Sequence, residues 1–298
     1  MFQYHCLNPI AGVGLANFNE NYQQTESLEG ADAVLVRSAA MHGMELPKSL
    51  LAVARAGAGV NNIPLTDCAE QGIVVFNTPG ANANGVKELV LAGMLLASRD
   101  IAGGIEWVKS DKEDGDIAKT AEKQKKKFAG CEISGKKLGI IGLGAIGLWT
   151  ARMAKGFGMK VIANSRHKKT GPQYDGIEQV SMEEIFERSD VISIHCPHTK
   201  ETENLLNREA FAKMKDGVII INTARGIIID EEALLEALES RKVYMAGLDV
   251  VANEPPQYQI PLMQSPYTFI TSHIAWQPKA ARLRAVDLAM KNFRSYLE

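Results

Sequence analysis

The sequence predicts an α/β protein built from two doubly wound parallel sheets, and three observations support this prediction. Short apolar runs of strand length alternate with helical stretches along the whole chain, which is typical of parallel sheets with helical crossovers. A glycine-rich turn, Gly142-x-Gly144-x-x-Gly147, lies between an apolar run and a helical stretch. The chain has 298 residues, of which 46% are hydrophobic, so it is long enough for two cores.

The first hundred residues predict a separate, smaller sheet. Apolar runs at 33–36, 52–54 and 73–76 have the length of buried strands, and turns with glycine or proline follow them. Apolar positions at helical spacing then predict a helix over about 84–99. The stretch 109–127 is rich in lysine and acidic residues, so we expect an exposed linker there.

The second sheet starts at Lys137. Five more apolar runs predict strands at 161–162, 191–194, 218–221, 245–248 and 269–270. Six strands are the number in a dinucleotide-binding sheet. Because 278–297 has apolar residues at helical spacing, we expect a last helix that returns to the first domain. The predicted substrate domain therefore comprises residues 1–100 and 274–298, and the predicted dinucleotide-binding domain comprises residues 101–273.

Charge and cysteine content narrow the class of protein. The net charge of −2 argues against general binding to nucleic acid or to a membrane surface. Four cysteines without a Cys-x-x-Cys pair predict free thiols and no structural zinc. The N-terminus has no leader-like pattern, and no apolar run reaches about 18 residues. We therefore expect a cytoplasmic protein that binds a small molecule, with no metal, nucleic acid or membrane partner.

The glycine-rich turn has the residues that phosphate binding needs. Gly142 permits a tight turn, Gly144 lets the backbone approach a pyrophosphate, and Gly147 lets the helix pack closely on the strand. The helix start at Ala145 and Ile146 offers free N–H groups and a positive dipole end. Such turns also arise for steric reasons alone. Here the strand-turn-helix-strand context favours a nicotinamide dinucleotide.

The end of the next strand is expected to select the cofactor. NAD sites commonly place Asp or Glu there to bind the ribose 2′-hydroxyl. This chain instead has Ser165 and Arg166, followed by further basic residues. Arginine binds a 2′-phosphate through bidentate hydrogen bonds, although a solvated basic loop would look the same. The pattern favours NADP(H) slightly and leaves NAD(H) open.

Polar residues follow three strands of the second sheet. Arg225, Asp249 and His273 stand at the carboxyl ends of apolar runs, the edge where doubly wound folds bind ligands. Glu254 follows Asp249 closely. A cation for a carboxylate, a histidine as proton donor and an acid that stabilises the protonated histidine are what reduction of a 2-oxo acid requires. Alone, such residues are more often surface ion pairs or core residues.

The motifs around these residues resemble those of the D-isomer-specific 2-hydroxyacid dehydrogenases over essentially the full chain. The matching strings are Gly142-Leu-Gly-Ala-Ile-Gly147, Asn222-Thr-Ala-Arg-Gly226, Gly247-Leu-Asp-Val250 through Glu254-Pro255, and Ser272-His-Ile-Ala275. The resemblance implies a flavodoxin-like substrate domain, a Rossmann cofactor domain and hydride transfer between the nicotinamide and C2 of the substrate. It also implies a homodimer through the cofactor domains, with contacts near residues 80–99.

The resemblance also implies roles for individual residues. Arg225 would bind the substrate carboxylate and polarise the keto group, His273 would transfer the proton, and Glu254 would act on His273. Asp249 would lie near the nicotinamide carboxamide. Further residues expected at the cofactor are His195, Cys196, Pro197, Thr223 and Ala224.

The two halves of the chain resemble different members of this family. The N-terminal half looks like 3-phosphoglycerate dehydrogenase, in which Arg37 and Arg55 would bind a substrate phosphate. The backbone N–H groups of Ala58, Gly59 and Val60 would then meet the carboxylate. The C-terminal half looks like glycerate dehydrogenases, which are also called hydroxypyruvate or glyoxylate reductases. There Trp276 would narrow the pocket beside His273.

Three substrates therefore remain open: hydroxypyruvate, glyoxylate and phosphohydroxypyruvate. Two alternatives to an active enzyme also remain. One is a cofactor-sensing binding protein like the corepressors of the same family, and the other is a recombined or designed chain with poor activity. Because the chain ends directly after the last predicted helix, we expect no C-terminal regulatory domain.

Overall fold

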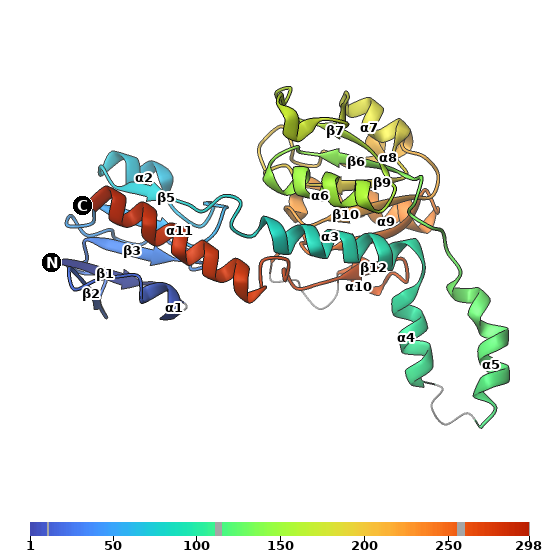
Figure 1. Cartoon of the computed structure of the whole chain (residues 1–298), viewed down its shortest axis with the longest axis horizontal. Coiled ribbons are helices and arrows are strands. Elements are labelled where there is room, and N and C mark those ends of the chain that lie inside the picture. The colour runs from blue at the N-terminus through green and yellow to red at the C-terminus, as the bar shows by residue number, and fades with distance from the viewer. Residues whose placement is uncertain (11, 111–114, 255–259, 298) are drawn as a thin grey trace. The chain divides into compact units, whose positions relative to one another are not determined.

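The computed structural model describes residues 1–10, 12–110, 115–254 and 260–297. The chain forms two compact units (Figure 1). Unit 1 contains residues 1–85 and 276–298, and unit 2 contains residues 86–275. Within the described ranges, no helix has the length and apolarity needed to cross a membrane.

Unit 1 is built on a five-stranded parallel sheet with the order β2-β1-β3-β4-β5, which is that of flavodoxin-like folds. The strands are β1 (Phe2–Cys6), β2 (Tyr22–Thr25), β3 (Ala33–Val36), β4 (Ala52–Arg55) and β5 (Val74–Phe76). The sequence predicts β3, β4 and β5. It misses β1 and β2, because polar residues interrupt their apolar pattern.

Helices cover both faces of this sheet. On one face, α1 (Gly12–Leu15) and α11 (Lys279–Leu297) enclose a core that includes Val286, Met290 and Phe293. On the other face, Cys68 of α2 (Leu65–Glu70) is buried with residues of β3 and β4. The last helix therefore completes unit 1, as the sequence predicts, because its apolar side finds its partners there.

Unit 2 is built on a seven-stranded parallel sheet with the order β12-β11-β10-β9-β6-β7-β8. The strands are β6 (Lys137–Ile141), β7 (Lys160–Asn164), β8 (Glu178–Gln179), β9 (Val191–Ile194), β10 (Val218–Asn222), β11 (Val243–Leu248) and β12 (Thr268–Ile270). This is the Rossmann order with one more strand, β12, at an edge. All six predicted strands are present. The short β8 leaves no readable apolar pattern.

Helices also cover both faces of the second sheet (Figure 1). The first face carries α3 (Ala83–Ser98) and α6 (Ala145–Gly156), and the second carries α7 (Met182–Arg188), α8 (Arg208–Lys213) and α9 (Glu231–Glu239). The short α10 (Pro261–Gln264) packs on β12. Contacts place the unit boundaries at 85/86 and 275/276, whereas the sequence suggests 100/101 and 273/274. Most of α3 joins unit 2 because Val86, Val90 and Met94 are buried in its core.

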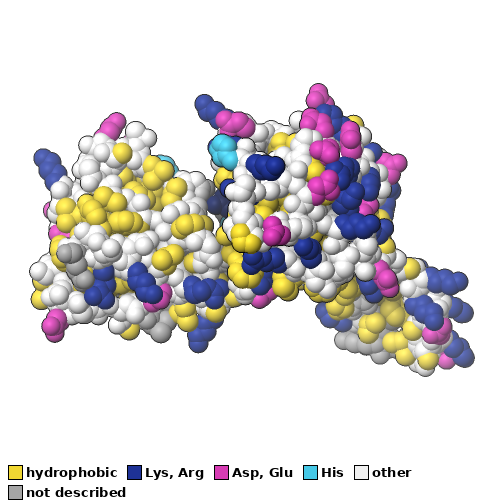
Figure 2. Space-filling model, turned by 45° about the horizontal axis from the view of Figure 1, so that its top comes forward, with side chains coloured by type: hydrophobic (Ala, Val, Ile, Leu, Met, Phe, Trp, Pro, Cys, Tyr) yellow, Lys and Arg dark blue, Asp and Glu magenta, His cyan; other side chains and the backbone are white. Residues whose placement is uncertain are grey.

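A pair of helices, α4 (Ile101–Ser110) and α5 (Ile117–Gln124), projects from unit 2 (Figure 1). None of the residues described on these helices is buried. Their support includes Phe128 of the 3₁₀ turn η1 (Lys125–Phe128), whose ring lies 6.1 Å from that of Trp107. Figure 2 shows hydrophobic side chains next to lysines on this pair. The described part of the predicted linker at 109–127 thus has no buried residue, but part of it forms a helix; residues 111–114 lie outside the described ranges.

Candidate active site

The glycine-rich turn lies between the carboxyl ends of β6 and β9, where the strand order of the unit 2 sheet reverses. Gly142 has a φ of +102°, and a Cβ on it would lie 2.6 Å from the backbone nitrogen of Cys196. A Cβ on Gly147 would lie 2.2 Å from the carbonyl oxygen of Gly142. A Cβ on Gly144 would meet nothing within 4 Å. Close backbone packing therefore requires the first and third glycines, and the second faces open space.

The first turn of α6 has no side-chain cap. Its N-cap is Gly144, whereas Ser181, Asn207 and Asp230 cap α7, α8 and α9 with hydrogen bonds from their side chains. The N–H groups at the start of α6, around Ala145 and Ile146, therefore remain available to an anion.

A second feature at this edge comes from the turn after β10. The hydroxyl oxygen of Thr223 is buried, and no described group forms a hydrogen bond with it. The open space at Gly144, the uncapped start of α6 and this hydroxyl together fit a dinucleotide. Gly142, Gly144, Ala145, Ile146 and Thr223 are the residues that could hold it.

The segment after β9 brings two titratable groups to the same turn. His195 Nε2 forms a 2.9 Å hydrogen bond with the Ser193 hydroxyl, and burial lowers the pKa of His195 to about 3. Burial also raises the pKa of the Cys196 thiol to about 11. At neutral pH both side chains are uncharged, so neither provides an acid, a base or a nucleophile here. His195, Cys196 and the next residue, Pro197, therefore place uncharged side chains beside the glycine-rich turn.

The residues that directly follow β7, from Ser165 to Lys169, include no acid. The Asn164 amide donates to the carbonyl of Val180 at 2.9 Å, and the Ser165 hydroxyl donates to the carbonyl of His167 at 2.8 Å. Arg166 is exposed, and its guanidinium lies 3.7 Å from a carboxylate oxygen of Glu201. An exposed ion pair of this length contributes little stability, so it leaves Arg166 able to change partners.

Arg225 is presented by a turn that Asn222 closes. The Asn222 amide donates to the carbonyl of Arg225 at 2.9 Å and accepts from the N–H of Ala224 at 3.0 Å. The guanidinium of Arg225 donates to the carbonyl of Ala224 at 2.6 Å. A Cβ on the next residue, Gly226, would lie 1.9 Å from the carbonyl carbon of Val251. Only glycine therefore lets this turn pack against the segment that leads to Glu254.

His273 and Glu254 form a hydrogen-bonded pair. His273 Nδ1 lies 2.8 Å from a carboxylate oxygen of Glu254, and the two side chains are 39% and 34% exposed. A carboxylate can only accept, so Nδ1 carries the proton, and among the described residues Nε2 has no hydrogen-bond partner. The backbone φ of His273 is +54°, in the left-handed region. Pro255 of the predicted motif lies outside the described residues.

Asp249 is buried, with 2% of its surface exposed. One carboxylate oxygen accepts from the Thr271 hydroxyl at 2.6 Å and from the N–H of Ile274 at 2.8 Å. The other accepts from the N–H of Ala275 at 2.9 Å. Because β10, β11 and β12 are neighbours, their turns meet at one edge of unit 2. The structure thus brings the predicted Arg225, Asp249, Glu254 and His273 to this edge.

The residues predicted to bind substrate in unit 1 lie at the carboxyl edge of its own sheet. Arg37 follows β3, and its guanidinium carbon lies 5.0 Å from the centre of the Trp276 ring. Arg55 ends β4, and its Nε donates to the Asn62 side chain at 3.0 Å. Asn8, after β1, accepts from the N–H groups of Arg37, Ser38 and Ala39 at 3.0 to 3.3 Å.

The turn after β4 is fixed by its neighbours. The carbonyl of Ala58 accepts from the Asn77 amide at 2.7 Å, and the N–H of Thr78 donates to the carbonyl of Gly57 at 3.0 Å. In the described part of the chain, no acceptor is bonded to the N–H groups of Ala58, Gly59 or Val60. These N–H groups can therefore receive a carboxylate.

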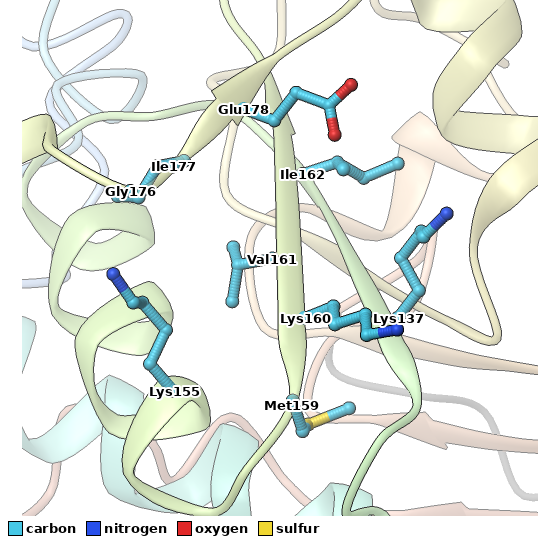
Figure 3. A pocket seen from close by; sticks show the side chains of 9 residues that line it. All are labelled: Lys137, Lys155, Met159, Lys160, Val161, Ile162, Gly176, Ile177 and Glu178. Carbon is cyan, nitrogen blue, oxygen red and sulfur yellow. The ribbon is translucent and has the colours of Figure 1, made fainter.

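A hollow of about 590 Å³ lies elsewhere on unit 2 (Figure 3). Its lining includes Lys137 and Lys160 at the starts of β6 and β7, together with Lys155 of α6 and Glu178 of β8. The glycine-rich turn and the Ser165 loop follow the opposite ends of these strands. The hollow is therefore separate from the candidate active site.

Sequence reasoning missed the supporting residues of the site. Asn222, Thr271 and Asn8 hold turns through hydrogen bonds and were not singled out. The position of Asn222 at the end of an apolar run was a usable signal, because Asn commonly closes turns with its side chain. Asn8 had no such signal, since β1 itself was not predicted.

Comparison with known proteins identifies the family. Residues 91–275 match the family model of the D-isomer specific 2-hydroxyacid dehydrogenase, NAD binding domain. The chain belongs to the D-isomer specific 2-hydroxyacid dehydrogenase family. The resemblance drawn from the sequence motifs is thereby confirmed, and the family model indicates a nicotinamide cofactor.

Two relatives in this family match both units of the chain. A hydroxypyruvate reductase from Thermotoga maritima is 43% identical over 270 residues, which cover 88% of this chain and 84% of the relative. A D-3-phosphoglycerate dehydrogenase from Archaeoglobus fulgidus is 39% identical over 256 residues, or 85% of this chain. This chain spans about half, 47%, of that relative's length. Because each match spans both units, single proteins account for the likeness of both halves.

A solved structure extends the likeness to the fold. The crystal structure of a glyoxylate reductase from Paecilomyes thermophila has a TM-score of 0.86 and 29% identity, and the match covers 100% of this chain and 95% of that one. Two parallel α/β domains are thus common to the two proteins.

Proposed function

We propose that this chain is an NAD(P)-dependent D-2-hydroxyacid dehydrogenase that interconverts a small 2-oxo acid and its 2-hydroxy acid. The observation that carries the proposal is the pair of His273 and Glu254 at 2.8 Å, on the same sheet edge as the Arg225 turn. The glycine-rich turn of the same unit fits the dinucleotide. Family membership supports the reaction class.

In the direction of reduction, Arg225 binds the substrate carboxylate through charge-assisted hydrogen bonds and polarises the C2 carbonyl. When bound, the reduced nicotinamide supplies the hydride that C2 receives. His273 gives its Nε2 proton to the carbonyl oxygen, so the 2-oxo acid gains one hydride and one proton. Glu254 stays bonded to Nδ1, where it orients the ring and stabilises its protonated form. In the reverse direction His273 takes up the proton from the hydroxyl.

The substrate-binding part of the proposal rests on unit 1. Arg37 and Arg55 are two cations at one sheet edge, which favours an acid that carries a phosphate. The Trp276 indole covers a face of the Arg37 guanidinium, which favours a smaller acid. If Trp276 determines which acid binds, the proposed substrates are hydroxypyruvate and glyoxylate. If Arg37 and Arg55 determine it, the proposed substrate is phosphohydroxypyruvate.

The cofactor part of the proposal is a preference for NADP(H). No acid follows β7, and Arg166 is exposed in a weak ion pair with Glu201 that a 2′-phosphate could replace. Bidentate binding by this guanidinium would favour NADP(H) over NAD(H). NAD(H) remains a usable cofactor in this proposal, because Arg166 does not obstruct a 2′-hydroxyl.

The oligomer in this proposal is a homodimer formed through unit 2. Its basis is exposed apolar surface: Val108 on α4 is 54% exposed, and Trp149 and Met153 of α6 and the C-cap residue Phe157 are exposed at four-residue spacing. A projecting helix without buried residues commonly marks an interface. Sedimentation equilibrium should give twice the chain mass, and Val108→Asp should shift the protein towards one chain mass. A monomeric wild-type protein would overturn the dimer.

The cytoplasm is the proposed location of this enzyme. The structure has four free cysteines, Cys6, Cys68, Cys131 and Cys196, and a reducing compartment keeps such thiols free. Cell fractionation with antibodies against the full chain checks this proposal.

The experiment that tests the function is a parallel assay with the full chain. Oxidation of NADPH and of NADH is followed with hydroxypyruvate, glyoxylate and phosphohydroxypyruvate. We expect turnover of at least one acid, with a larger kcat/KM for NADPH. Cofactor binding without any turnover would overturn the proposed enzyme and support a cofactor-sensing binding protein or an inactive chain instead.

A further inference from the structure

The backbone of His273 has a conformation that needs outside support. Its φ of +54° lies in the left-handed region, which is uncommon for residues other than glycine. Only Asn204 and Arg241 share a positive φ among the other non-glycine residues that are described. Such conformations persist where the surrounding structure holds them, and they concentrate at functional sites. The contacts around His273 should therefore show what holds it.

Asp249 makes those contacts. Its carboxylate accepts hydrogen bonds from the Thr271 hydroxyl and from the N–H groups of Ile274 and Ala275, and its backbone carbonyl accepts from the N–H of His273 at 2.9 Å. Four of the five residues from 271 to 275 thus donate to this one residue. The turn that presents His273 is folded around Asp249.

The free-energy cost of burying the Asp249 carboxylate indicates a role beyond general stability. Asp249 is buried, and no described lysine, arginine or histidine lies within 4 Å of its carboxylate oxygens. A buried carboxylate without a cation is costly unless hydrogen bonds replace its hydration. Here the replacement comes from the turn itself, through charge-assisted bonds that are stronger than neutral ones. The hydrogen bonds that stabilise the charge of Asp249 are therefore the same bonds that order residues 271–275.

We propose that Asp249 is a positioning residue, whose carboxylate holds the turn after β12 so that His273 keeps its left-handed backbone and meets Glu254. This inference rests on the proposed catalytic role of His273. It differs from a contact with the nicotinamide carboxamide, which the family resemblance implies for Asp249. The difference is measurable: a positioning residue acts on kcat through His273, whereas a cofactor contact acts on cofactor affinity.

The first test is Asp249→Asn. The new amide keeps the size of the side chain, but its NH₂ group would face a backbone N–H or a hydroxyl, so the turn loses acceptors. We expect kcat with hydroxypyruvate to fall at least about 30-fold, while KM and the Kd for NADPH change by less than about threefold. Hydrogen exchange at the amides of Ile274 and Ala275 should accelerate at least about tenfold, with or without cofactor.

A matched control comes from another carboxylate of unit 2. Asp190 directly precedes β9, at the edge of the sheet opposite to the candidate active site. Its carboxylate accepts from the N–H of Lys137 at 2.7 Å and from the Lys215 ammonium at 2.9 Å. Asp190→Asn makes the same chemical change without touching the turn. We expect its Tm to fall while kcat and exchange at Ile274 and Ala275 stay at wild-type values. Thr271→Val removes one of the four bonds and should lower kcat about three- to tenfold.

Several outcomes would overturn the inference. A loss of NADPH affinity that matches the loss of kcat would assign Asp249 to the cofactor, and unchanged kcat with unchanged exchange would show that the turn holds itself. If Asp249→Asn does not fold, Thr271→Val decides: wild-type kcat and wild-type exchange in that variant reject the proposal. If the wild-type chain reduces none of the acids, the proposed function fails, and hydrogen exchange still tests the positioning of the turn.

Discussion

The carboxyl edges of the two sheets make an instructive comparison. Both sheets are parallel, and both place polar groups where the strand order reverses or strands end. The edge of unit 1 presents Arg37, Arg55 and backbone N–H groups, all of them suited to an anion. The edge of unit 2 presents the glycine-rich turn together with the bonded pair of His273 and Glu254.

The comparison teaches that one architecture serves two tasks, because the side chains after the strands differ. Arg37 and Arg55 at the edge of unit 1 hold fixed positive charge, which serves recognition. The edge of unit 2 adds a histidine that can exchange a proton, which serves chemistry. We therefore expect substitutions in unit 2 to act mainly on kcat and substitutions in unit 1 to act mainly on KM.

The largest expected effect is that of His273→Ala. It removes the proton donor from unit 2, so kcat/KM should fall about 1,000-fold or more, while the Kd for NADPH stays within about threefold. Stopped-flow or steady-state NADPH oxidation measures the first quantity, and fluorescence titration of NADPH measures the second. A variant that keeps its kcat but loses substrate affinity would break the assignment of chemistry to unit 2.

Arg37→Met tests the other side of the comparison. Loss of the guanidinium should raise the KM for phosphohydroxypyruvate about 10- to 100-fold, with a smaller rise for glyoxylate and little change in kcat. Lys48→Met, an exposed cation of the same unit without a proposed role, is the control. Equal effects on all three acids would mean that Arg37 does not discriminate the phosphate.

Arg166→Ala sharpens the comparison within unit 2, because it separates cofactor selection from catalysis. We expect kcat/KM for NADPH to fall about tenfold, since one charge-assisted contact to the 2′-phosphate is lost, and kcat/KM for NADH to stay unchanged. Lys168→Ala, in the same exposed loop, should leave both values near those of the wild type. A parallel loss with both cofactors would refute the 2′-phosphate contact.

The smallest expected effect concerns stability and pH. The pKa of His195 is about 3 in the folded protein, below its ordinary value of 6.5, because the ring is buried. Between these values the unfolded chain binds the extra proton, so the stability that neutral His195 contributes is present above pH 6.5 and is lost as pH falls towards 3.

Urea unfolding at pH 7 and pH 5 measures this effect. The free energy of unfolding should fall by roughly 1–2 kcal/mol more in the wild type than in His195→Gln, after allowance for partial solvent access. His167→Gln, which changes an exposed histidine, should show the same fall in the free energy of unfolding between pH 7 and pH 5 as the wild type. If the free energy of unfolding falls equally in the wild type and in His195→Gln, His195 becomes protonated in the folded protein.

The strands that were predicted and those that were missed differ in whether their sequences contain a run of apolar residues. The strands β9, β10 and β11 of unit 2 lie in the interior of the sheet with both faces covered, so their sequences are nearly continuous apolar runs. The edge strand β2 has one buried residue, Tyr22, and β8 has only two residues. The edge strands β5 and β12 have no buried residue, but they contain consecutive apolar residues, so the pattern still indicates them. A strand without consecutive apolar residues, such as β2 or β8, stays hidden in the pattern.

The helix α5 was missed for a related reason. None of its residues described by the structure is buried, and a polar sequence without a buried face is indistinguishable from a linker. The catalytic candidates were easier to find, because Arg225, Glu254 and His273 follow or lie near apolar strands and belong to distinctive motifs. Their roles stay predictions until the variants are measured.

The sequence by itself determined the two-sheet architecture, the glycine-rich turn and the family, because these depend on short contiguous patterns of apolar residues and glycines. Only the tertiary structure decided which groups support the site. Asp249 meets Thr271, Ile274 and Ala275 across more than twenty residues of chain, and Gly226 admits the backbone of Val251. Such contacts arise when neighbouring strands bring distant turns together, and no local pattern in the chain records them.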